Sequence, residues 1–316
     1  MKSLTIETPS RLHFGLLGWG PQSYRQFGGF GLMIDDPGIE LTVKPSETWE
    51  ATGDYAGRAL EIAKHLASQL NQIQPARLDL KRVPREHVGL GVGTQLSMAV
   101  ARALTLLYGL DDIPGIELAR LCGRGLRSGV GIHGFSHGGL IVDAGRRGDS
   151  EIPTLLNAIP FPEEWSILLA TPKHDQGLHG MAEIGAFQTL NEMPVTMTER
   201  ICRLLFLQVL PAVLEKDLDA FGDGLSEIQR FVGEIFSPVQ GGSFASPETE
   251  SRIKAMTNSG LRGVGQSSWG PTLYGFLDDS ISSDRTALLN TLQEYPTTKV
   301  MQWIWTRANR KGFKFK

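Results

Sequence analysis

Three glycines alternate within five positions of this chain, at Gly89, Gly91 and Gly93, and an Ala/Leu-rich run follows them. Glycine has no Cβ, so the backbone there can turn tightly and present its N–H groups to a neighbour. The apolar spacing of residues 96–107 predicts a buried helix directly after the turn. A helix N-terminus carries unpaired N–H donors and a partial positive charge, which suit a phosphate. The glycine turn and the helix after it predict an anion-binding site. The alternative is a plain loop that caps a core helix.

Two further glycine clusters, 123–139 and 263–272, are each flanked by regular structure. Loop residues held by rigid elements commonly carry binding groups. If the clusters converge, they form a cleft lined by backbone donors and by Arg11, His13, Arg127, His133 and Trp269. Arginines beside an aromatic wall suit a phosphorylated substrate next to a planar ring. The alternatives are structural: Arg11 as a surface strand residue, His133 as a buried histidine and Trp269 as a core residue.

Composition limits the classes of function. The chain has 316 residues and a net charge of −3, which predicts two domains and gives no basic footprint for nucleic acid. Its two cysteines, Cys122 and Cys202, lie in apolar helical runs and are expected to be reduced. No apolar run approaches the ~20 residues of a membrane helix, and the N-terminus lacks the apolar region of a signal peptide. We therefore expect a cytoplasmic protein with no membrane partner.

Strand-like and helix-like segments are mixed along the chain without strict alternation, which predicts an α+β fold or a mixed α/β sandwich. Strands are expected at 4–8, 11–15, 27–34, 39–44, 77–83, 140–143, 165–171, 273–277 and 300–305. Helices are expected at 55–70, 96–107, 116–122, 197–214, 218–231, 248–258 and 284–293. The glycine cluster at 123–139 and the polar segment 146–157 are expected to be loops.

Several familiar signatures are incomplete. Residues 129–134 fit G-x-G-x-x-G, but they follow helix-like sequence rather than a strand, so the context of a dinucleotide site is missing. Neither a Walker-type phosphate loop nor a G-x-S-x-G nucleophile elbow occurs. His133 and His137 are four positions apart, but glycines surround both and no glutamate lies beside the first, which argues against a zinc pair.

Three motifs occur in an order that is typical of one superfamily. They are Pro-Ser-Arg-Leu-His-Phe-Gly at 9–15, the glycine turn within 84–95, and the last glycine cluster at 263–270. On these motifs the chain resembles the GHMP superfamily of small-molecule kinases, which includes galactokinases, homoserine kinases, mevalonate kinases and phosphomevalonate kinases. The resemblance spans nearly the whole chain.

Two departures from the kinase pattern bear on activity. Val92 and Gly93 replace the two serines of the kinase phosphate loop, so a metal would be held differently, with Thr94 as its candidate ligand. The kinase motif Ser-Gly-Val-Asp is Ser-Gly-Val-Gly at 128–131, so Gly131 stands where the kinases carry their catalytic aspartate. A phosphoryl transfer that uses a carboxylate to deprotonate a hydroxyl loses that group.

One branch of the superfamily, the β-ribofuranosylaminobenzene 5′-phosphate synthases, is similar at the altered positions. Its motifs are matched by residues 10–15, by Gly-Leu-Gly-Val-Gly-Thr-Gln at 89–95, by Arg-Ser-Gly-Val-Gly-Ile at 127–132 and by Gly-Gln-Ser-Ser-Trp-Gly-Pro-Thr at 265–272. The resemblance implies that 4-aminobenzoate condenses with phosphoribosyl pyrophosphate. Pyrophosphate and carbon dioxide leave, and a C-riboside forms on the route to methanopterin-type carriers such as tetrahydromethanopterin.

The implied chemistry agrees with the missing aspartate. The amino group enriches the ring carbon that bears the carboxylate, and this carbon attacks the anomeric carbon as pyrophosphate departs. Rearomatisation expels carbon dioxide rather than a proton, so no carboxylate base is expected at the reacting centre. The remaining tasks are to hold pyrophosphate, to stabilise an oxocarbenium-like transition state and to fix the ring.

The resemblance implies an α+β fold: a two-domain GHMP-kinase-like α/β sandwich with mixed sheets. The N-terminal domain, 1–160, would carry the phosphate loop, the C-terminal domain would be 161–316, and the ligand cleft would lie between them. The catalytic candidates are His13, Arg127 and His133. The substrate- and phosphate-binding candidates are Arg11, Gly89, Gly91, Gly93, Thr94, Gln95, Ser128, Gly265, Gln266, Ser267, Ser268 and Trp269.

The expected roles follow from these types of residue. Residues 89–95 would cradle a phosphate or pyrophosphate with Mg²⁺, for which Thr94 is the protein ligand, and no ATP is expected. Arg11 and Arg127 would pair with phosphate or carboxylate. His13 and His133 would contact substrate, and residues 266–269 would line the ring or the ribose.

Two other hypotheses stay open at this point. One is a kinase that keeps ATP chemistry with a substitute base, as the homoserine kinases manage without the usual aspartate. The other is a non-catalytic binder of a phosphorylated ligand. In each case the partners are small molecules, no nucleic acid is expected, and a homodimer is compatible with the sequence.

Overall fold

The computed structural model describes residues 3–148, 151–173, 185, 190–240, 242, 244, 246–281 and 284–316. Its first sheet has the order β11-β1-β2-β4-β3, and β5 and β6 extend it from β2. These strands are β1 (Leu4–Gly18), β2 (Phe27–Pro45), β3 (Glu50–Thr52), β4 (Ala76–Arg82), β5 (Leu140–Asp143), β6 (Leu155–Ile159) and β11 (Lys314–Phe315). No helix among the described residues is long and apolar enough to span a bilayer.

The two longest strands, β1 and β2, replace four shorter strands that were predicted. Their antiparallel register shifts between Thr8 and Ser10 and again between His13 and Gly15. Such bulges let a strand absorb an irregular residue, here Pro9, and continue in the same sheet. The second shift also bends β1 next to His13, which places this side chain at a point where the strand is locally irregular.

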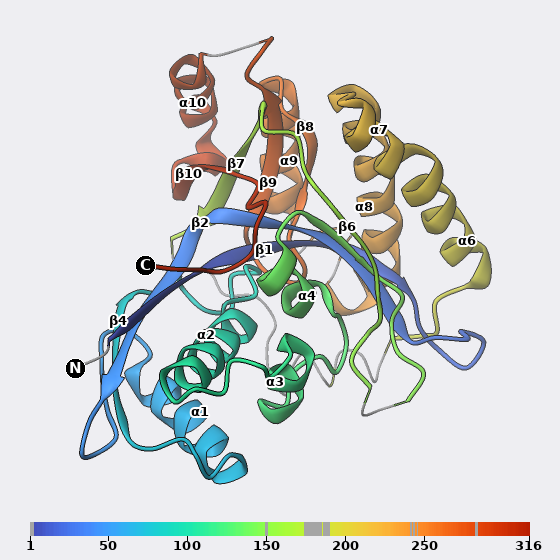
Figure 1. Cartoon of the computed structure of the whole chain (residues 1–316). Coiled ribbons are helices and arrows are strands. Elements are labelled where there is room, and N and C mark those ends of the chain that lie inside the picture. Colours follow the sequence, from blue (N-terminus) through green and yellow to red (C-terminus); the bar gives the residue numbers. More distant parts are fainter. Residues whose placement is uncertain are drawn as a thin grey trace.

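Helices cover one face of the first sheet. They are α1 (Ala56–Gln69), α2 (Val92–Leu107), α3 (Gly115–Leu121) and α4 (Val130–His137). Figure 1 shows α1, α2 and α3 below the blue strands β1 and β2, while the second sheet and its helices lie above them. Nearly every residue of α2 is buried, as the Ala/Leu-rich run predicted.

The second sheet has the order β10-β7-β9-β8, with strands β7 (Trp165–Pro172), β8 (Arg262–Gln266), β9 (Leu273–Asp278) and β10 (Met301–Arg307). Its helical elements are α6 (Val195–Leu204), the π-helical turn η1 (Leu205–Val209), α7 (Leu210–Glu215), α8 (Leu218–Gln240), α9 (Pro247–Asn258), α10 (Arg285–Glu294) and the short η2 (Pro296–Thr298). Phe14 of β1 packs against Tyr274 of β9 with ring centroids 5.1 Å apart, so the two sheets share one continuous core.

One predicted loop is partly a helix. Residues 123–139 were expected to form a glycine-rich loop, but α4 occupies Val130–His137 within it. A Cβ at Gly134 would collide with the Met33 sulfur on β2, so glycine allows α4 to lie close against the sheet. The polar segment 146–157 also differs from its prediction, because its end begins β6.

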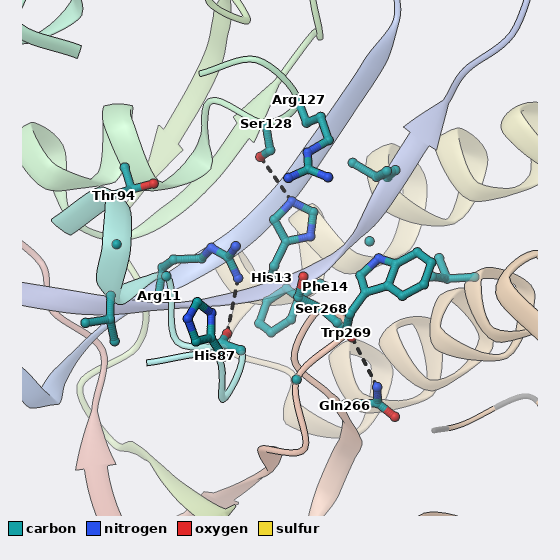
Figure 2. Close-up of a pocket in the computed structure, with 18 of the residues that line it drawn as sticks. Arg11, His13, Phe14, His87, Thr94, Arg127, Ser128, Gln266, Ser268 and Trp269 are labelled. Atoms are coloured by element: carbon teal, nitrogen blue, oxygen red, sulfur yellow. Dashed lines mark hydrogen bonds between the residues drawn. The ribbon is translucent and has the colours of Figure 1, made fainter. Parts of the chain in front are cut away.

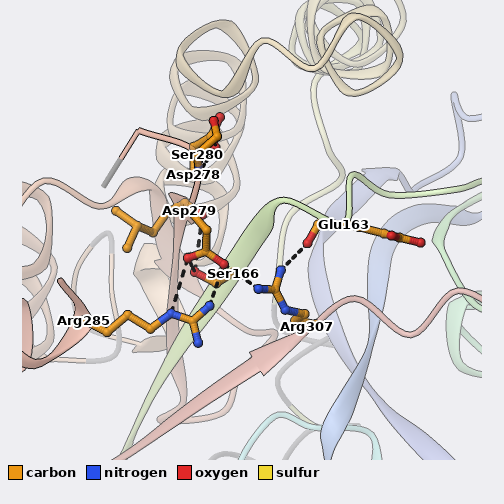
Figure 3. A network of polar contacts seen from close by, with 8 residues as sticks. Glu163, Ser166, Asp278, Asp279, Ser280, Arg285 and Arg307 are labelled. Atoms are coloured by element: carbon orange, nitrogen blue, oxygen red, sulfur yellow. Dashed lines mark hydrogen bonds and ion pairs between the residues drawn. The ribbon is translucent and has the colours of Figure 1, made fainter. Parts of the chain in front are cut away.

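An acidic residue ties the edge of the second sheet to its neighbours (Figure 3). Asp279, just after β9, pairs with Arg285 of α10 at 2.6 Å and with Arg307 of β10 at 2.5 Å. Ser166 of β7 donates a hydrogen bond to its other oxygen at 2.9 Å. Burial opposes ionisation of Asp279, but these partners outweigh it and lower the pKa of the carboxyl. The cluster is a structural feature of the second sheet.

Candidate active site

The three glycine clusters come together around one cavity of about 460 Å³. Its walls come from β1, from the loop before α2, from the loop before α4, from α8 and from the turn between β8 and β9. Figure 2 shows the side chains from these segments that face the cavity. The convergence that was expected from the sequence is therefore a feature of the structure.

The turn before α2 requires its glycines. Gly89 and Gly91 have φ values of 92° and 70°, in the region that disfavours a side chain. A Cβ at Gly89 would strike the carbonyl oxygen of Ser267, and a Cβ at Gly91 would lie 2.6 Å from Arg11 Cγ. No side chain caps α2 and no acidic residue lies in its first turn, so this N-terminus keeps its positive end towards the pocket beside Thr94.

The turn between β8 and β9 is hydrogen-bonded to the glycine turn before α2 and to β1. The hydroxyl of Ser267 donates to the Gly89 carbonyl at 2.7 Å and accepts from the backbone N–H of His13 at 3.1 Å. The N–H of Ser268 donates to the His13 carbonyl at 3.1 Å. A Cβ at Gly270 would collide with the backbone of Gly89. Backbone thus packs directly on backbone, which fixes the relative positions of the pocket walls.

Four arginines line the pocket, from three segments: Arg11 on β1, Arg58 on α1, and Arg124 and Arg127 in the loop before α4. Among the described lining residues the only acid is Glu86, and it forms an ion pair with Arg58. Positive charge therefore exceeds negative charge in the pocket, which favours an anionic ligand. Arg58 and Arg124 were not singled out from the sequence, because α1 has the pattern of an ordinary amphipathic helix and Arg124 lies between glycines.

Arg58 and Arg124 lie at the start of α2. A Cβ at Gly93 would be 2.9 Å from the guanidinium of Arg58, and Arg124 Nε donates to Ser97 Oγ at 3.0 Å. Burial, and then the charge of Arg58, lower the pKa of Arg124. Two cations held near one another and near a helix N-terminus gain most from a multiply charged anion.

His13 lies deeper, on β1, and is almost fully buried. Burial lowers the pKa of its imidazole well below the usual value, and the charges of Arg11 and Arg127 lower it further. The ring is therefore neutral at pH 7. Its Nε2 lies 3.0 Å from Ser128 Oγ (Figure 2).

A carboxylate lies behind Ser128, although the motif at 128–131 has none. Asp143, at the end of β5, accepts from Ser128 Oγ at 3.2 Å and from the Gly129 N–H at 2.9 Å through Oδ2. Its Oδ1 accepts from the Gly145 N–H at 2.9 Å. Burial raises the pKa of Asp143 to about 6, against the lowering effect of these donors. Asp143 was not predicted as a site residue, because in the sequence it is only an acid at the end of an apolar strand.

An apolar wall completes the pocket. The indole of Trp269 packs edge-on against Phe236 of α8, with ring centroids 4.7 Å apart. Leu16 and Val232 also line this region. The cavity thus offers a cationic part and an aromatic part, which suits a ligand with both phosphate and a planar ring.

Most of the residues predicted for the site line this pocket, and four lie behind its surface. His133 Nε2 is 2.7 Å from the Pro153 carbonyl, and Gln95 donates to the Gly131 carbonyl at 2.7 Å. Gly265 on β8 and Ser267 in the β8–β9 turn are both buried. The roles predicted for these four residues stay predictions. The structure also adds His87 to the lining, beside Arg11 in Figure 2.

The pocket has no preformed cage for a metal. Within the described part of the chain, no three His, Cys, Asp or Glu residues are grouped to hold one. Thr94, the predicted ligand, lines the pocket at the first turn of α2. Mg²⁺ is often held by one or two carboxylates together with substrate phosphates and waters. The oxygen groups that fit this pattern here are the Thr94 hydroxyl and the Glu86 carboxylate.

The chain is similar to archaeal proteins named beta-ribofuranosylphenol 5′-phosphate synthase. The one from Methanothermobacter thermautotrophicus is 32% identical over 298 residues, which cover 87% of this chain and 89% of the relative. The one from Archaeoglobus fulgidus is 33% identical over 329 residues and covers 98% of both chains. No protein-family model matches the chain.

Among solved structures, a homoserine kinase from Cytophaga hutchinsonii has a TM-score of 0.72 at 15% identity, over 100% of this chain and 98% of the other. At that identity the likeness concerns the fold. It confirms the fold class predicted from the sequence, a GHMP-kinase-like α+β architecture with mixed sheets.

Proposed function

Because the chain belongs to the family of the archaeal beta-ribofuranosylphenol 5′-phosphate synthases, we propose that it transfers a ribose 5-phosphate unit from phosphoribosyl pyrophosphate to a para-substituted benzoate. The ring carbon that bears the carboxylate bonds to the anomeric carbon, and the C–O bond to pyrophosphate breaks with its electron pair. The bond to the carboxylate then breaks, carbon dioxide leaves, and the electron pair restores the aromatic ring. The product is a C-riboside.

The observation that carries this proposal is the division of the pocket into a cationic part and an aromatic part. Arg58 and Arg124, beside the N-terminus of α2, suit the diphosphate of the donor. Trp269 and Phe236 suit the benzoate ring. A ligand with only a phosphate or only a ring would contact one part of the pocket and leave the other part without a binding partner.

The chain's own groups would act mainly by position and charge. Negative charge grows on the departing diphosphate, where the arginines and the α2 N–H groups can stabilise it. The aromatic wall would hold the ring against the anomeric carbon, which replaces a bimolecular encounter with a positioned one. Both effects need the rigid packing between the glycine turn and the β8–β9 turn.

Mg²⁺ is part of the proposal. Thr94 and Glu86 fit it as oxygen ligands, with diphosphate oxygens and water for the remaining positions. When bound, the ion would neutralise charge on the diphosphate and make it a better leaving group. Removal of divalent ions with EDTA should therefore abolish turnover, and added Mg²⁺ should restore it.

The acceptor has two candidates that differ in one group. The motifs of the sequence imply 4-aminobenzoate, whereas the relatives are named for a phenol product, which corresponds to 4-hydroxybenzoate as acceptor. Both are planar anions of nearly the same size, so the pocket dimensions do not separate them.

The test is direct. Purified protein is incubated with phosphoribosyl pyrophosphate, Mg²⁺ and either acceptor carrying a labelled carboxyl group, and released carbon dioxide and pyrophosphate are measured. Equimolar release with at least one acceptor is the expected result. ATP consumption without release would support the kinase instead, and ligand-induced thermal stabilisation without turnover would support a non-catalytic binder.

A further inference from the structure

The hydrogen bonds around Ser128 fix the position of a proton on His13. The hydroxyl oxygen of Ser128 accepts from the Val130 N–H at 3.2 Å, and its single proton goes to Asp143 Oδ2 at 3.2 Å, because a carboxylate can only accept. Ser128 then has no proton left for His13. Its contact with His13 Nε2 at 3.0 Å is a hydrogen bond only if Nε2 is the donor. Neutral His13 therefore carries its proton on Nε2 and a lone pair on Nδ1.

The lone pair faces the cavity. His13 lines the cavity, and Figure 2 shows one ring nitrogen turned to Ser128 and the other turned away from it, towards the side of Trp269. Among the described residues, no hydrogen bond of a side chain to Nδ1 is present. The ring is thus held on one edge by protein and has an unprotonated nitrogen on the other edge.

His13, Ser128 and Asp143 form one hydrogen-bonded unit. Charged and titratable groups face this unit from each element that packs on it. Arg11 on β1 and Arg127 before α4 act on His13. Next to Asp143, Arg25 donates to the carbonyls of Ala144 and Gly145 at 2.9 Å each. His133 of α4 is turned to the Pro153 carbonyl. The only carboxylate hydrogen-bonded to Ser128 among the described residues is that of Asp143.

We propose that His13, through Nδ1, is the general base that accepts the proton of a hydroxyl group para to the acceptor's carboxylate. Asp143 is a positioning residue that acts through Ser128 by holding the His13 proton on Nε2. This inference rests on the proposed function and assigns its acceptor as a 4-hydroxybenzoate. The base is a histidine, so the proposal is compatible with the expectation that no carboxylate base acts at the reacting centre.

The proton and electrons balance. The hydroxyl proton moves to Nδ1, and the resulting phenolate drives the ring carbon onto the anomeric carbon as pyrophosphate leaves. Loss of carbon dioxide returns an electron pair to the ring and regenerates a phenolate, which takes the proton back from Nδ1. Proton transfer creates a phenolate and an imidazolium together, so the net charge beside Arg11 and Arg127 does not change.

An amino acceptor makes a different demand. The amine lone pair drives the same attack and gives an iminium ion, and loss of carbon dioxide returns the neutral amine without any proton transfer. A general base therefore accelerates the reaction of the hydroxyl acceptor and has no effect on the reaction of the amino acceptor. General bases commonly contribute about 10²- to 10⁴-fold to rate, so the two acceptors should respond differently to damage in this unit.

Nitrogen NMR of ¹⁵N-histidine protein tests the geometry without catalysis. The His13 signals are assigned as those lost in His13→Gln. At pH 7.5 we expect a protonated, pyrrole-type Nε2 and an unprotonated, pyridine-type Nδ1, and Ser128→Ala should mix the two tautomers. A proton on Nδ1 in the wild type would overturn the proposal.

Kinetics with both acceptors test the role. Ser128→Ala should lower kcat for 4-hydroxybenzoate about 10- to 100-fold and kcat for 4-aminobenzoate less than about threefold, because the amine needs no base. Ser68→Ala on the exposed face of α1 is the matched control and should change neither value. Equal losses of kcat with both acceptors would overturn the role of His13 as a base and leave the proposed function standing. No turnover of either acceptor by the wild type would overturn the proposed function and the catalytic role with it.

Discussion

Ser267 donates a hydrogen bond to the carbonyl of Gly89 at 2.7 Å, although 178 positions separate them in the chain. This contact joins the last glycine cluster to the first. It forms only because the backbone at Gly89 lies against the backbone of the β8–β9 turn, with no room for a side chain between them. The cationic and aromatic parts of the pocket therefore depend on one close approach of two loops.

Gly89→Ala should break this approach. The new Cβ would strike the Ser267 carbonyl oxygen at a backbone φ of 92°. We expect a loss of about 2–4 kcal/mol in the free energy of unfolding, and a large rise in KM for phosphoribosyl pyrophosphate, measured by urea unfolding and steady-state kinetics. Gly109→Ala is the matched control, since Gly109 has a φ of 74° with nothing within 4 Å of the new Cβ. It should cost only about 1–2 kcal/mol, and equal effects of the two changes would contradict the close-approach argument.

Arg124→Gln should weaken binding of the diphosphate donor. The change removes a partly buried cation beside Arg58 at the start of α2, and charge-assisted hydrogen bonds are worth about 1.5–3 kcal/mol. KM for phosphoribosyl pyrophosphate should therefore rise roughly 10- to 100-fold, with little change in KM for the benzoate. Arg120→Gln, in an exposed ion pair with Glu117 on α3, is the control and should leave both constants within about twofold. A rise confined to the benzoate would place the donor's diphosphate elsewhere.

The parts of the site that the sequence predicted are those that lie within contiguous motifs. Arg11 and His13 stand two apart on a strand, and Gly89, Gly91 and Gly93 carry their conformational requirement in their own residue type. These features are local, so a single sequence displays them.

The parts that were missed depend on contacts between distant segments. Arg58 occupies a polar position of an amphipathic helix, where a solvated side chain is the ordinary expectation. Asp143 reaches Ser128 only because β5 pairs with β2 and α4 packs on both. The helix α4 itself was predicted as a loop, since the low helix propensity of glycine masks the close packing that glycine permits against Met33.

Asp279→Asn should destabilise the second sheet without touching the pocket. The change removes the charge that holds Arg285 and Arg307, and the expected cost is about 1.5–3 kcal/mol in urea unfolding. Since the pKa of Asp279 is lowered in the folded state, its contribution is present above the pKa of the unfolded chain and is lost as pH falls. Glu234→Gln, which removes an exposed pair with Arg230, should cost less than about 0.5 kcal/mol. A similar cost for both changes would show that the Asp279 cluster adds nothing beyond a surface pair.

The pKa of Asp143, raised by burial to about 6, predicts how activity depends on pH. Below pH 6 the carboxyl is protonated and can donate to Ser128, whose own proton can then pass to His13 Nε2. The proton that His13 carries moves to Nδ1, and the base is lost. With 4-hydroxybenzoate, kcat should therefore fall as pH drops through about 6, because the active form has ionised Asp143. Ser128→Ala should flatten this limb, and an unchanged limb would assign the titration to another group.

Stability should move in the opposite direction from activity. The pKa of Asp143 in the folded state, about 6, lies above the ordinary value of 3.8, so the fold prefers the protonated carboxyl. Its contribution to the free energy of unfolding is fully present below the pKa of the unfolded chain and is lost as pH rises through about 6.

Asp143→Asn cannot titrate, and its amide N–H would face backbone donors, so it should be less stable than the wild type at pH 7.5. Between pH 7.5 and pH 4 the wild type should gain up to about 3 kcal/mol relative to this variant in urea unfolding. A difference that stays constant over this range would mean that Asp143 is already protonated at pH 7.5 or ionised throughout, and would remove it as the source of the pH dependence of kcat.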